Sequence, residues 1–247
     1  MPQVIAVGLG TLFTVQSAKL SSAPNSGPMQ TLAWLAKNNR PPEKRKVGFV
    51  KHTWHPAEEA ISLSTPDDAY GYAAEIFTAP AVRGHALEAL GIAAWPIALV
   101  PVPASCTVRN RTPGERWPAL AFAEQLAARG LGRVVPCVVN KKPTQEQTTS
   151  RSRTPAHEVA ENLEVIGTPP RGHSVVFVDD VITWGARTAA MNHALQWTGP
   201  TAAMCIAFTN EGHGAVDCYQ PKKRVIAYDP SARPWVVTIS EPSTTRG

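Results

Sequence analysis

Short apolar runs alternate with helical stripes along most of this chain. The runs with the length and content of buried strands are 4–15, 97–103, 133–139, 174–180 and 202–208. Between them stand helix signals: a Thr-Pro-Asp-Asp start at Thr65, apolar residues at helical spacing, and prolines or glycines where a helix must stop. These signals predict helices over 66–79, 81–90, 118–129 and 186–197.

The order of these elements is strand, helix, strand, polar excursion, strand, helix, strand. That order is typical of an α/β protein with a mainly parallel central sheet and helices on both faces. The excursion at 140–158 is polar and offers little to a core, so we expect it to be mobile. We expect three parts: an N-terminal addition bearing a strand (1–60), the α/β core (61–210) and a C-terminal β-like extension (211–247).

Composition narrows the classes of protein that fit. No window reaches the roughly 20 apolar residues of a membrane span, so we expect no membrane contact. The apolar opening at 4–15 lacks a basic leader, and we interpret it as a buried strand rather than a signal peptide. The four cysteines are scattered without a C-x-x-C pair, which excludes zinc-ribbon spacing and favours a reducing, cytoplasmic setting. The net charge of +5 favours anionic partners.

Two adjacent acids, Asp179 and Asp180, end the apolar run that begins at Ser174, just before a short loop with Gly185. In an open α/β sheet, ligands bind outside the carboxyl ends of the strands. Amides at a glycine turn that starts a helix form a phosphate site. Two carboxylates accept hydrogen bonds from sugar hydroxyls or hold the hydration shell of a metal. Together they predict a site for a ribose 5-phosphate; the alternative, a helix cap, accounts for one acid.

The residues around this loop resemble a known motif. The segment VVFVDDVITWGART (175–188) is similar to the phosphoribosyl-pyrophosphate (PRPP) motif of type I phosphoribosyltransferases, with four hydrophobic residues, two acids and a loop containing Thr and Gly. VPVP at 100–103 and the Arg-rich loop after it resemble a segment of the competence-protein ComF family. The order T, Q, S, R, N of that family is matched in the excursion by Thr144, Gln147, Ser150, Arg151, Arg153 and Asn162. The resemblance covers about residues 95–210.

The resemblance implies a role for each part of the site. Asp179 and Asp180 would hold the ribose 2- and 3-hydroxyls, and so contact indirectly the Mg²⁺ that arrives with PRPP. The excursion would close over the ligand, where Arg151 and Arg153 would stabilise the leaving pyrophosphate while water is excluded. The other implied substrate-binding residues are Thr183, Trp184, Gly185, Ala186, Arg187 and Thr188 around the 5-phosphate, and Pro103, Ala104 and Ser105 around the pyrophosphate. We expect the pyrophosphate to be contacted by Arg109, Arg111 or Arg116, together with Arg151 or Arg153, and these alternatives stay open.

The chain departs from the family pattern in the phosphate loop and at its start. Trp184 and Arg187 stand where the family has small or hydroxylated residues, and no cysteine precedes Cys106 where ComF-like proteins carry a zinc ribbon. Arg187 is expected either to grip phosphate through its guanidinium or to fill the site. Thr188, one place later, points elsewhere on a helix.

Two functions stay open from the sequence. The first is a Mg²⁺-dependent phosphoribosyltransferase that transfers phosphoribosyl to or from a nucleobase-like acceptor with release of pyrophosphate. The second is a binding module without catalysis, which senses PRPP or a nucleotide or handles single-stranded DNA, since basic loops suit a single strand. The expected partners are PRPP or a nucleotide, with single-stranded nucleic acid and a second copy of the chain in a homodimer as alternatives.

Overall fold

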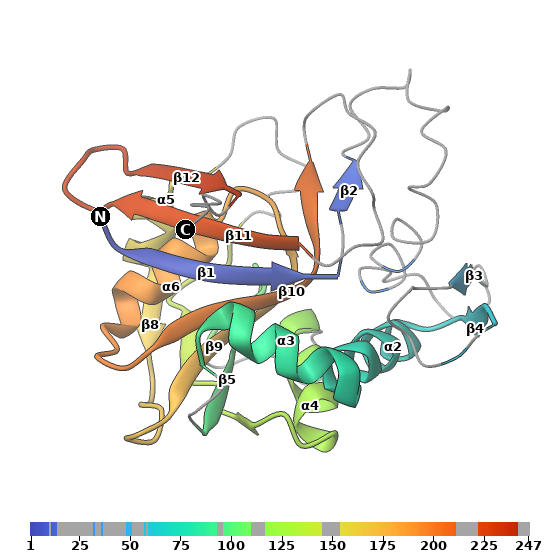
Figure 1. The fold of residues 1–247 in the computed structure, drawn as a ribbon. Helices are drawn as coiled ribbons and strands as arrows, with labels where there is room; N and C mark the ends of the chain where they lie inside the picture. Colours follow the sequence, from blue (N-terminus) through green and yellow to red (C-terminus); the bar gives the residue numbers. More distant parts are fainter. Residues whose placement is uncertain are drawn as a thin grey trace.

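A mixed, mostly parallel sheet forms the centre of the molecule (Figure 1). The computed structural model describes residues 1–9, 11–13, 32, 36, 48–50, 57, 59–92, 96–109, 117–144, 154–210 and 222–241. In this part of the chain the strand order is β12-β11-β1-β10-β9-β5-β6, and β2 pairs with the end of β10. Neighbours from β1 to β6 run parallel, whereas β11 and β12 are antiparallel. The predicted α/β class is confirmed.

The elements follow the predicted order along the chain. The strands of the central sheet are β1 (Gln3–Gly8), β2 (Thr11–Phe13), β5 (Ile97–Pro101), β6 (Arg133–Val134), β9 (Ser174–Ile182), β10 (Thr201–Asn210), β11 (Lys222–Asp229) and β12 (Val236–Ser240). Two small antiparallel pairs lie outside it: β3 (Gly48–Val50) with β4 (Ile61–Leu63), and β7 (Val138–Asn140) with β8 (Leu163–Val165). The helices are α2 (Pro66–Thr78), α3 (Pro80–Leu90), α4 (Pro118–Ala128), α5 (Ala156–Asn162) and α6 (Ala186–Leu195).

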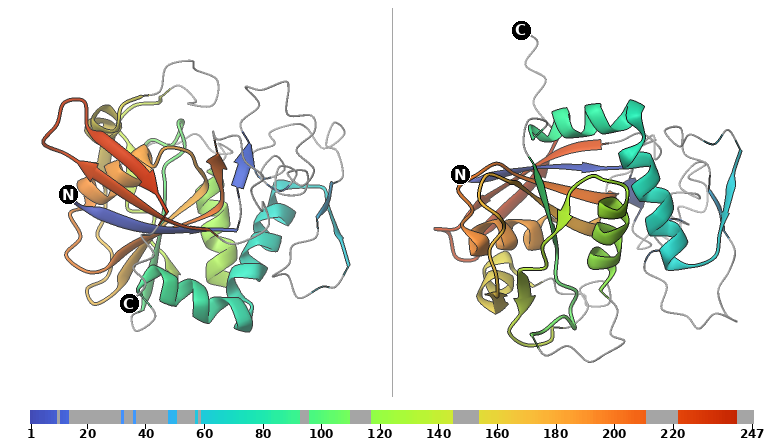
Figure 2. Two further views of the ribbon diagram at one scale, coloured as in Figure 1. Left: turned by 45° about the horizontal axis from the view of Figure 1, so that its top comes forward. Right: turned by 90° about the horizontal axis from the view of Figure 1, so that it is seen from below.

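Each face of the sheet has its own hydrophobic core, and helices cover both faces (Figures 1 and 2). Successive residues of β9 point to opposite faces. Val176 and Val178 join the core under α2, α3 and α4, whereas Val175 and Phe177 join the core under α6 and α5. This burial on both sides explains why the strand has a nearly continuous apolar sequence instead of an alternating one.

The apolar run at 133–139 forms two strands instead of the single one predicted. β6 pairs with β5 in the central sheet, whereas β7 pairs with β8 outside it. Pro136 stands between them, and a proline lacks the amide that a continuing ladder needs. The polar excursion is likewise shorter than predicted, because α5 begins at Ala156.

Both ends of the chain contribute strands to the central sheet. β1 lies between β10 and β11, and its parallel register joins Ile5 to Ala202 and Gly8 to Cys205. β11 pairs with the other edge of β1. β1, β2, β11 and β12 therefore extend the same sheet as the core strands, whereas β3 lies outside it. No helix in the described ranges is long and apolar enough to cross a membrane.

Candidate functional site at the ends of β5 and β9

The carboxyl ends of β5 and β9 lie side by side at a point where the chain leaves the sheet in opposite directions. The two strands pair in register from Ile97 opposite Ser174 to Pro101 opposite Val178. After β5 the chain passes through α4 on one face to β6, and after β9 it passes through α6 on the other face to β10. Such a topological switch point leaves a crevice between the two departing loops, which is where open α/β sheets bind ligands.

The loop after β5 has its backbone carbonyls held by other parts of the site. The Trp117 indole donates to Val102 O at 2.6 Å, and the Asn140 amide donates to Ala104 O at 2.6 Å. The amide of Thr144 donates to Ser105 O at 2.9 Å. Three carbonyls of the loop at 102–105 thus accept hydrogen bonds from Trp117, Asn140 and Thr144. These bonds hold the loop in one shape.

The two acids lie within β9, which continues past them to Ile182 instead of ending with them as predicted. The pairing of β9 with β10 continues past them, joining Asp179 to Cys205 and Val181 to Ala207. Each carboxylate accepts the next backbone amide at 2.9 Å: Asp179 from Asp180, and Asp180 from Val181. Asp179 is 9% exposed and Asp180 is half-buried. Because β5 ends at Pro101, both acids stand on the part of β9 that extends beyond its neighbour, at the mouth of the crevice.

Asp179 also shapes the chemistry of the residue beside it. The thiol of Cys205, the register partner of Asp179 on β10, is fully buried. Burial raises the pKa of this thiol well above its usual value, and the negative charge of Asp179 raises it further. Cys205 therefore stays neutral and serves as a small core residue next to the acid.

The loop between β9 and α6 is the tight turn that the sequence predicted. It consists of Thr183, Trp184 and Gly185, and the helix starts at Ala186 as expected. Gly185 has φ of +70°, and a Cβ at this position would lie 2.8 Å from Ile226 Cγ2 on β11. Only glycine meets both demands without strain. Ala189 N donates to Gly185 O as the first helical hydrogen bond, so the amides of residues 186–188 face away from the helix ladder.

The side chains of this turn point in different directions. Trp184 is 45% exposed, so it does not plug the crevice. Thr188 is 1% exposed and lies on the inner side of α6 with Ala189, Ala190 and Met191.

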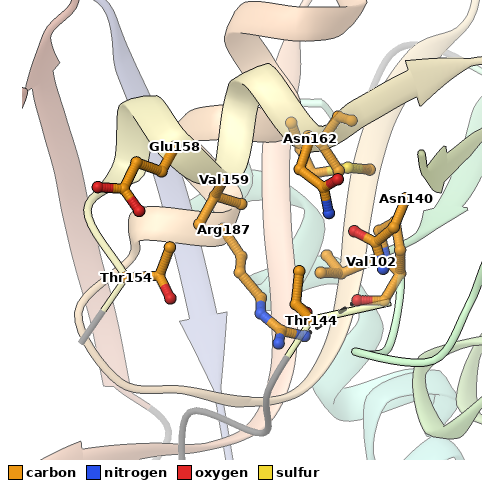
Figure 3. Close-up of a pocket in the computed structure, with 11 residues that line it drawn as sticks. Val102, Asn140, Thr144, Thr154, Glu158, Val159, Asn162 and Arg187 are labelled. Atoms are coloured by element: carbon orange, nitrogen blue, oxygen red, sulfur yellow. Dashed lines mark hydrogen bonds between the residues drawn. The ribbon is translucent and has the colours of Figure 1, made fainter. Parts of the chain in front are cut away.

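Arg187 reaches from α6 across the crevice to the loop after β5. Its Nη1 donates to Pro103 O at 3.0 Å. The side chain lines a small cavity of about 30 Å³, together with Val102, Pro103, Asn140, Thr144, Thr154, Glu158, Val159, Asn162, Leu163 and Met191 (Figure 3). This volume holds about two water molecules.

The two ends of the excursion are fastened next to this cavity. Asn162 at the end of α5 donates to Lys142 O at 3.0 Å, and its Oδ1 accepts the Lys142 amide at 3.3 Å. Lys141 N donates to Asn162 O at 2.7 Å in the β7–β8 ladder. Thr144 and Thr154, the last described residues on either side of 145–153, both line the cavity. The excursion therefore begins and ends at the crevice, where a segment that closes over a ligand must be attached.

The arginines expected around the pyrophosphate are mostly beyond the described part of the chain. Arg111, Arg116, Arg151 and Arg153 lie outside the described residues. Arg109 is described, and its exposed side chain forms a 3.1 Å ion pair with Glu164 on β8. Among the described residues, the guanidinium that lines the cavity is that of Arg187.

Sequence reasoning did not single out Asn140, Thr154 or Glu158 as site residues. Asn140 holds Ala104 O, and the other two line the cavity. Asn140 ends an apolar run and Glu158 lies in a segment that was interpreted as excursion. A polar residue at the end of a strand is a signal that could have pointed to Asn140, in the same way as it pointed to Asp179.

Asp179 and Asp180 are the carboxylates at this site that could contact a hydrated Mg²⁺. In the described ranges, no three His, Cys, Asp or Glu side chains gather to hold a metal. Two carboxylates at one strand end offer the oxygen donors that Mg²⁺ prefers, while the ion keeps several waters and takes ligand phosphates as its other partners.

Neither a known protein-family model nor a curated protein sequence matches this chain.

Proposed function

We propose that this protein binds PRPP, as its Mg²⁺ complex, or a ribose 5-phosphate nucleotide in the crevice between β5 and β9. The observation that carries this proposal is the topological switch point, with an acid pair on one strand and a glycine turn with free-facing helix amides directly after it. In an α/β sheet such a crevice is a ligand site. Carboxylates suit a sugar diol, and helix amides suit a phosphate dianion.

Each part of the ligand has a matching group in the crevice. Asp179 and Asp180 accept hydrogen bonds from the two ribose hydroxyls, after which the 5-phosphate extends to the amides of 185–188. The pyrophosphate lies along the loop at 103–105. The excursion between Thr144 and Thr154 closes over it and excludes water from an activated sugar. The fold is then that of a type I phosphoribosyltransferase, in line with the resemblance of residues 175–188.

The reaction is displacement of pyrophosphate from the anomeric carbon. The bond from that carbon to the pyrophosphate oxygen breaks, and its electron pair leaves with pyrophosphate. The lone pair of a nitrogen of a nucleobase-like acceptor forms the new bond, and the proton of that nitrogen is released to solvent. Asp179 and Asp180 would hold Mg²⁺ through ligand hydroxyls and water, and the ion would supply positive charge next to the leaving group. The chain's own cations stabilise the same charge, and the fixed loop at 102–105 keeps the leaving group in place.

The test is isothermal titration of Mg-PRPP into the wild type and into Asp179→Asn/Asp180→Asn. We expect a one-site isotherm in the wild type and a loss of affinity of at least 100-fold in the double variant. Asp67→Asn, which removes an exposed acid on α2, is the matched control and should bind like the wild type. Wild-type affinity in the double variant, or no binding of PRPP to the wild type, would refute the proposal.

A second function, binding without transfer, is favoured by the position of Arg187. Its side chain spans the crevice where the family loop has a small or hydroxylated residue. Assays of pyrophosphate release with PRPP and a panel of bases separate the enzyme from the sensor, since a sensor binds PRPP but releases no pyrophosphate. If the sensor handles single-stranded DNA instead, its affinity must fall steeply with salt, and a flat salt response argues against that partner.

A further inference from the structure

The guanidinium of Arg187 has few partners for a half-buried cation. A guanidinium has five N–H donors, and the structure gives that of Arg187 one hydrogen bond, to the neutral carbonyl of Pro103. Within the described ranges, no carboxylate oxygen lies within 4.0 Å of it. A cation that is partly removed from water favours an anion over a carbonyl.

The surroundings of Arg187 provide further groups for an anion. Thr144 and Thr154 line the same cavity, and Figure 3 shows the Arg187 side chain extending toward Thr144, with Thr154 on its other side. Glu158 is the acid in the described lining, and Figure 3 shows its carboxylate directed away from the guanidinium. In the described part of the chain, the cavity thus combines two hydroxyls with one cation that has no ion-pair partner there.

The single hydrogen bond of Arg187 is one that an anion in the cavity can replace. The cavity of about 30 Å³ holds about two water molecules, and Arg187 is one of the residues that line it. Its guanidinium is held at the tip by one hydrogen bond to Pro103 O, and a phosphate-type anion offers that tip two parallel, charge-assisted bonds instead.

We propose that Arg187 exchanges partners: it holds Pro103 O in the free protein and moves to a phosphate-type dianion when one enters the cavity. The exchange couples the loop after β5 to α6, because the bond between them breaks as the anion binds. The proposal deepens the proposed function, since pyrophosphate is the phosphate-type anion released there, but it rests on Arg187 and not on the acid pair.

The experiment titrates inorganic pyrophosphate, and separately inorganic phosphate, into the full chain without Mg²⁺. Hydrogen bonds to a charged group predict about a 10- to 100-fold loss of pyrophosphate affinity in Arg187→Gln, and a smaller loss in Arg187→Lys, which keeps the charge without the fork. Glu158→Gln removes a negative charge from the lining and should bind at least as tightly as the wild type. Equal affinities in wild type and Arg187→Gln would overturn the exchange.

A spectroscopic signal separates exchange from a purely structural role. The ¹³C resonance of the Pro103 carbonyl reports its hydrogen bond to Arg187. In the wild type this resonance should shift on addition of pyrophosphate, while in Arg187→Gln it should start near the shifted position and stay there. An unchanged Pro103 resonance in the wild type at saturating pyrophosphate would show that the bond persists, and the proposal would fail.

The same titrations distinguish this proposal from the proposed function. Asp179→Asn/Asp180→Asn should abolish PRPP binding but should not weaken pyrophosphate binding. If pyrophosphate binds through Arg187 while PRPP does not bind, the exchange stands and the proposed function fails. If PRPP binding requires the two acids while pyrophosphate affinity is the same in the wild type and in Arg187→Gln, only the exchange fails.

Discussion

The side chain of Asn162 bonds the backbone of Lys142 in both directions, with its amide nitrogen donating to the carbonyl oxygen and its oxygen accepting from the amide. The two residues stand at opposite ends of the excursion, so this pair closes its base. Asn162 is 9% exposed, and loss of its side chain leaves two backbone groups without their partner.

Asn162→Ala should therefore lower the free energy of unfolding by about 1–3 kcal/mol, the cost of unsatisfied buried polar groups. Asn162→Asp keeps the acceptor but replaces the donating nitrogen with an oxygen that faces Lys142 O. We therefore expect it to lower the free energy of unfolding at least as much as Asn162→Ala does. Chemical denaturation measures both. Glu161→Ala, which removes an exposed side chain paired with Arg233, is the control and should cost under about 1 kcal/mol. A similar cost for Glu161→Ala and Asn162→Ala would contradict the assignment.

A second prediction concerns Gly185, which needs both a positive φ and a close approach to Ile226. Gly185→Ala should destabilise the protein more than Gly172→Ala. Gly172 has a similar φ of +76°, but a Cβ there would meet nothing within 4 Å. The control isolates the backbone cost, about 1–2 kcal/mol, and the excess at 185 measures the contact with β11.

A double-mutant cycle checks this assignment. If the excess arises from Ile226, Ile226→Ala should reduce the added cost of Gly185→Ala, and the two changes will not be additive. Equal costs at Gly185 and Gly172 would mean that the turn adapts, and the demand for glycine would then come from φ alone.

Much of this turn could be predicted from local sequence, because its causes are local. A run of apolar residues, a glycine and a helix start are adjacent in the chain, and α6 begins at Ala186 as predicted. The prediction ended this strand too early, at Asp180, because charged residues usually mark the end of a strand. Pairing with β10 overrides that tendency and carries the strand through Asp179 and Asp180 to Ile182.

The parts that were not predictable depend on contacts between distant segments. Nothing near Gln3 or Lys222 indicates that β1 and β11 pair with one another and with β10. The hydrogen bond between Arg187 and Pro103 joins residues 84 positions apart. The sequence left open whether Arg187 grips phosphate or fills the site, since that depends on which loop stands opposite α6.

A third prediction concerns the reactivity of the cysteines. Burial raises the pKa of the Cys137 thiol to about 11 and that of Cys205 well above its usual value. Both thiols are neutral and shielded at pH 8, whereas Cys106 in the loop after β5 is half-buried. In a Cys218→Ser variant, which removes the thiol outside the described residues, one thiol should react with a disulfide reagent in the folded protein.

The reagent should reach Cys137 and Cys205 only after unfolding in denaturant. Mass spectrometry of the labelled peptides identifies which cysteine reacted, and Cys106→Ser should abolish the fast phase. Rapid labelling of Cys205 in the native protein would contradict its burial beside Asp179.

The last prediction concerns the cap of α2 and its dependence on pH. Thr65 and Asp68 form a capping box: Thr65 Oγ1 accepts the Asp68 amide at 3.0 Å, and the Asp68 carboxylate accepts the amides of Thr65 at 2.7 Å and Ser64 at 2.9 Å. Partial burial raises the pKa of Asp68, but the hydrogen bonds from Ser64 and Thr65 outweigh it, and the net pKa is lowered from 3.8.

A carboxyl group with a depressed folded-state pKa stabilises the protein above its unfolded-state pKa, and that contribution is lost as the pH falls through the folded-state pKa. Asp68→Asn should therefore cost about 1 kcal/mol at pH 7, and the difference from the wild type should shrink below about pH 3.8. Asp67→Asn, in the same helical turn, is the matched control. Urea denaturation at pH 7 and pH 3 measures the difference, and an equal cost of Asp68→Asn at both pH values would show that the ionised carboxylate is not what stabilises the cap.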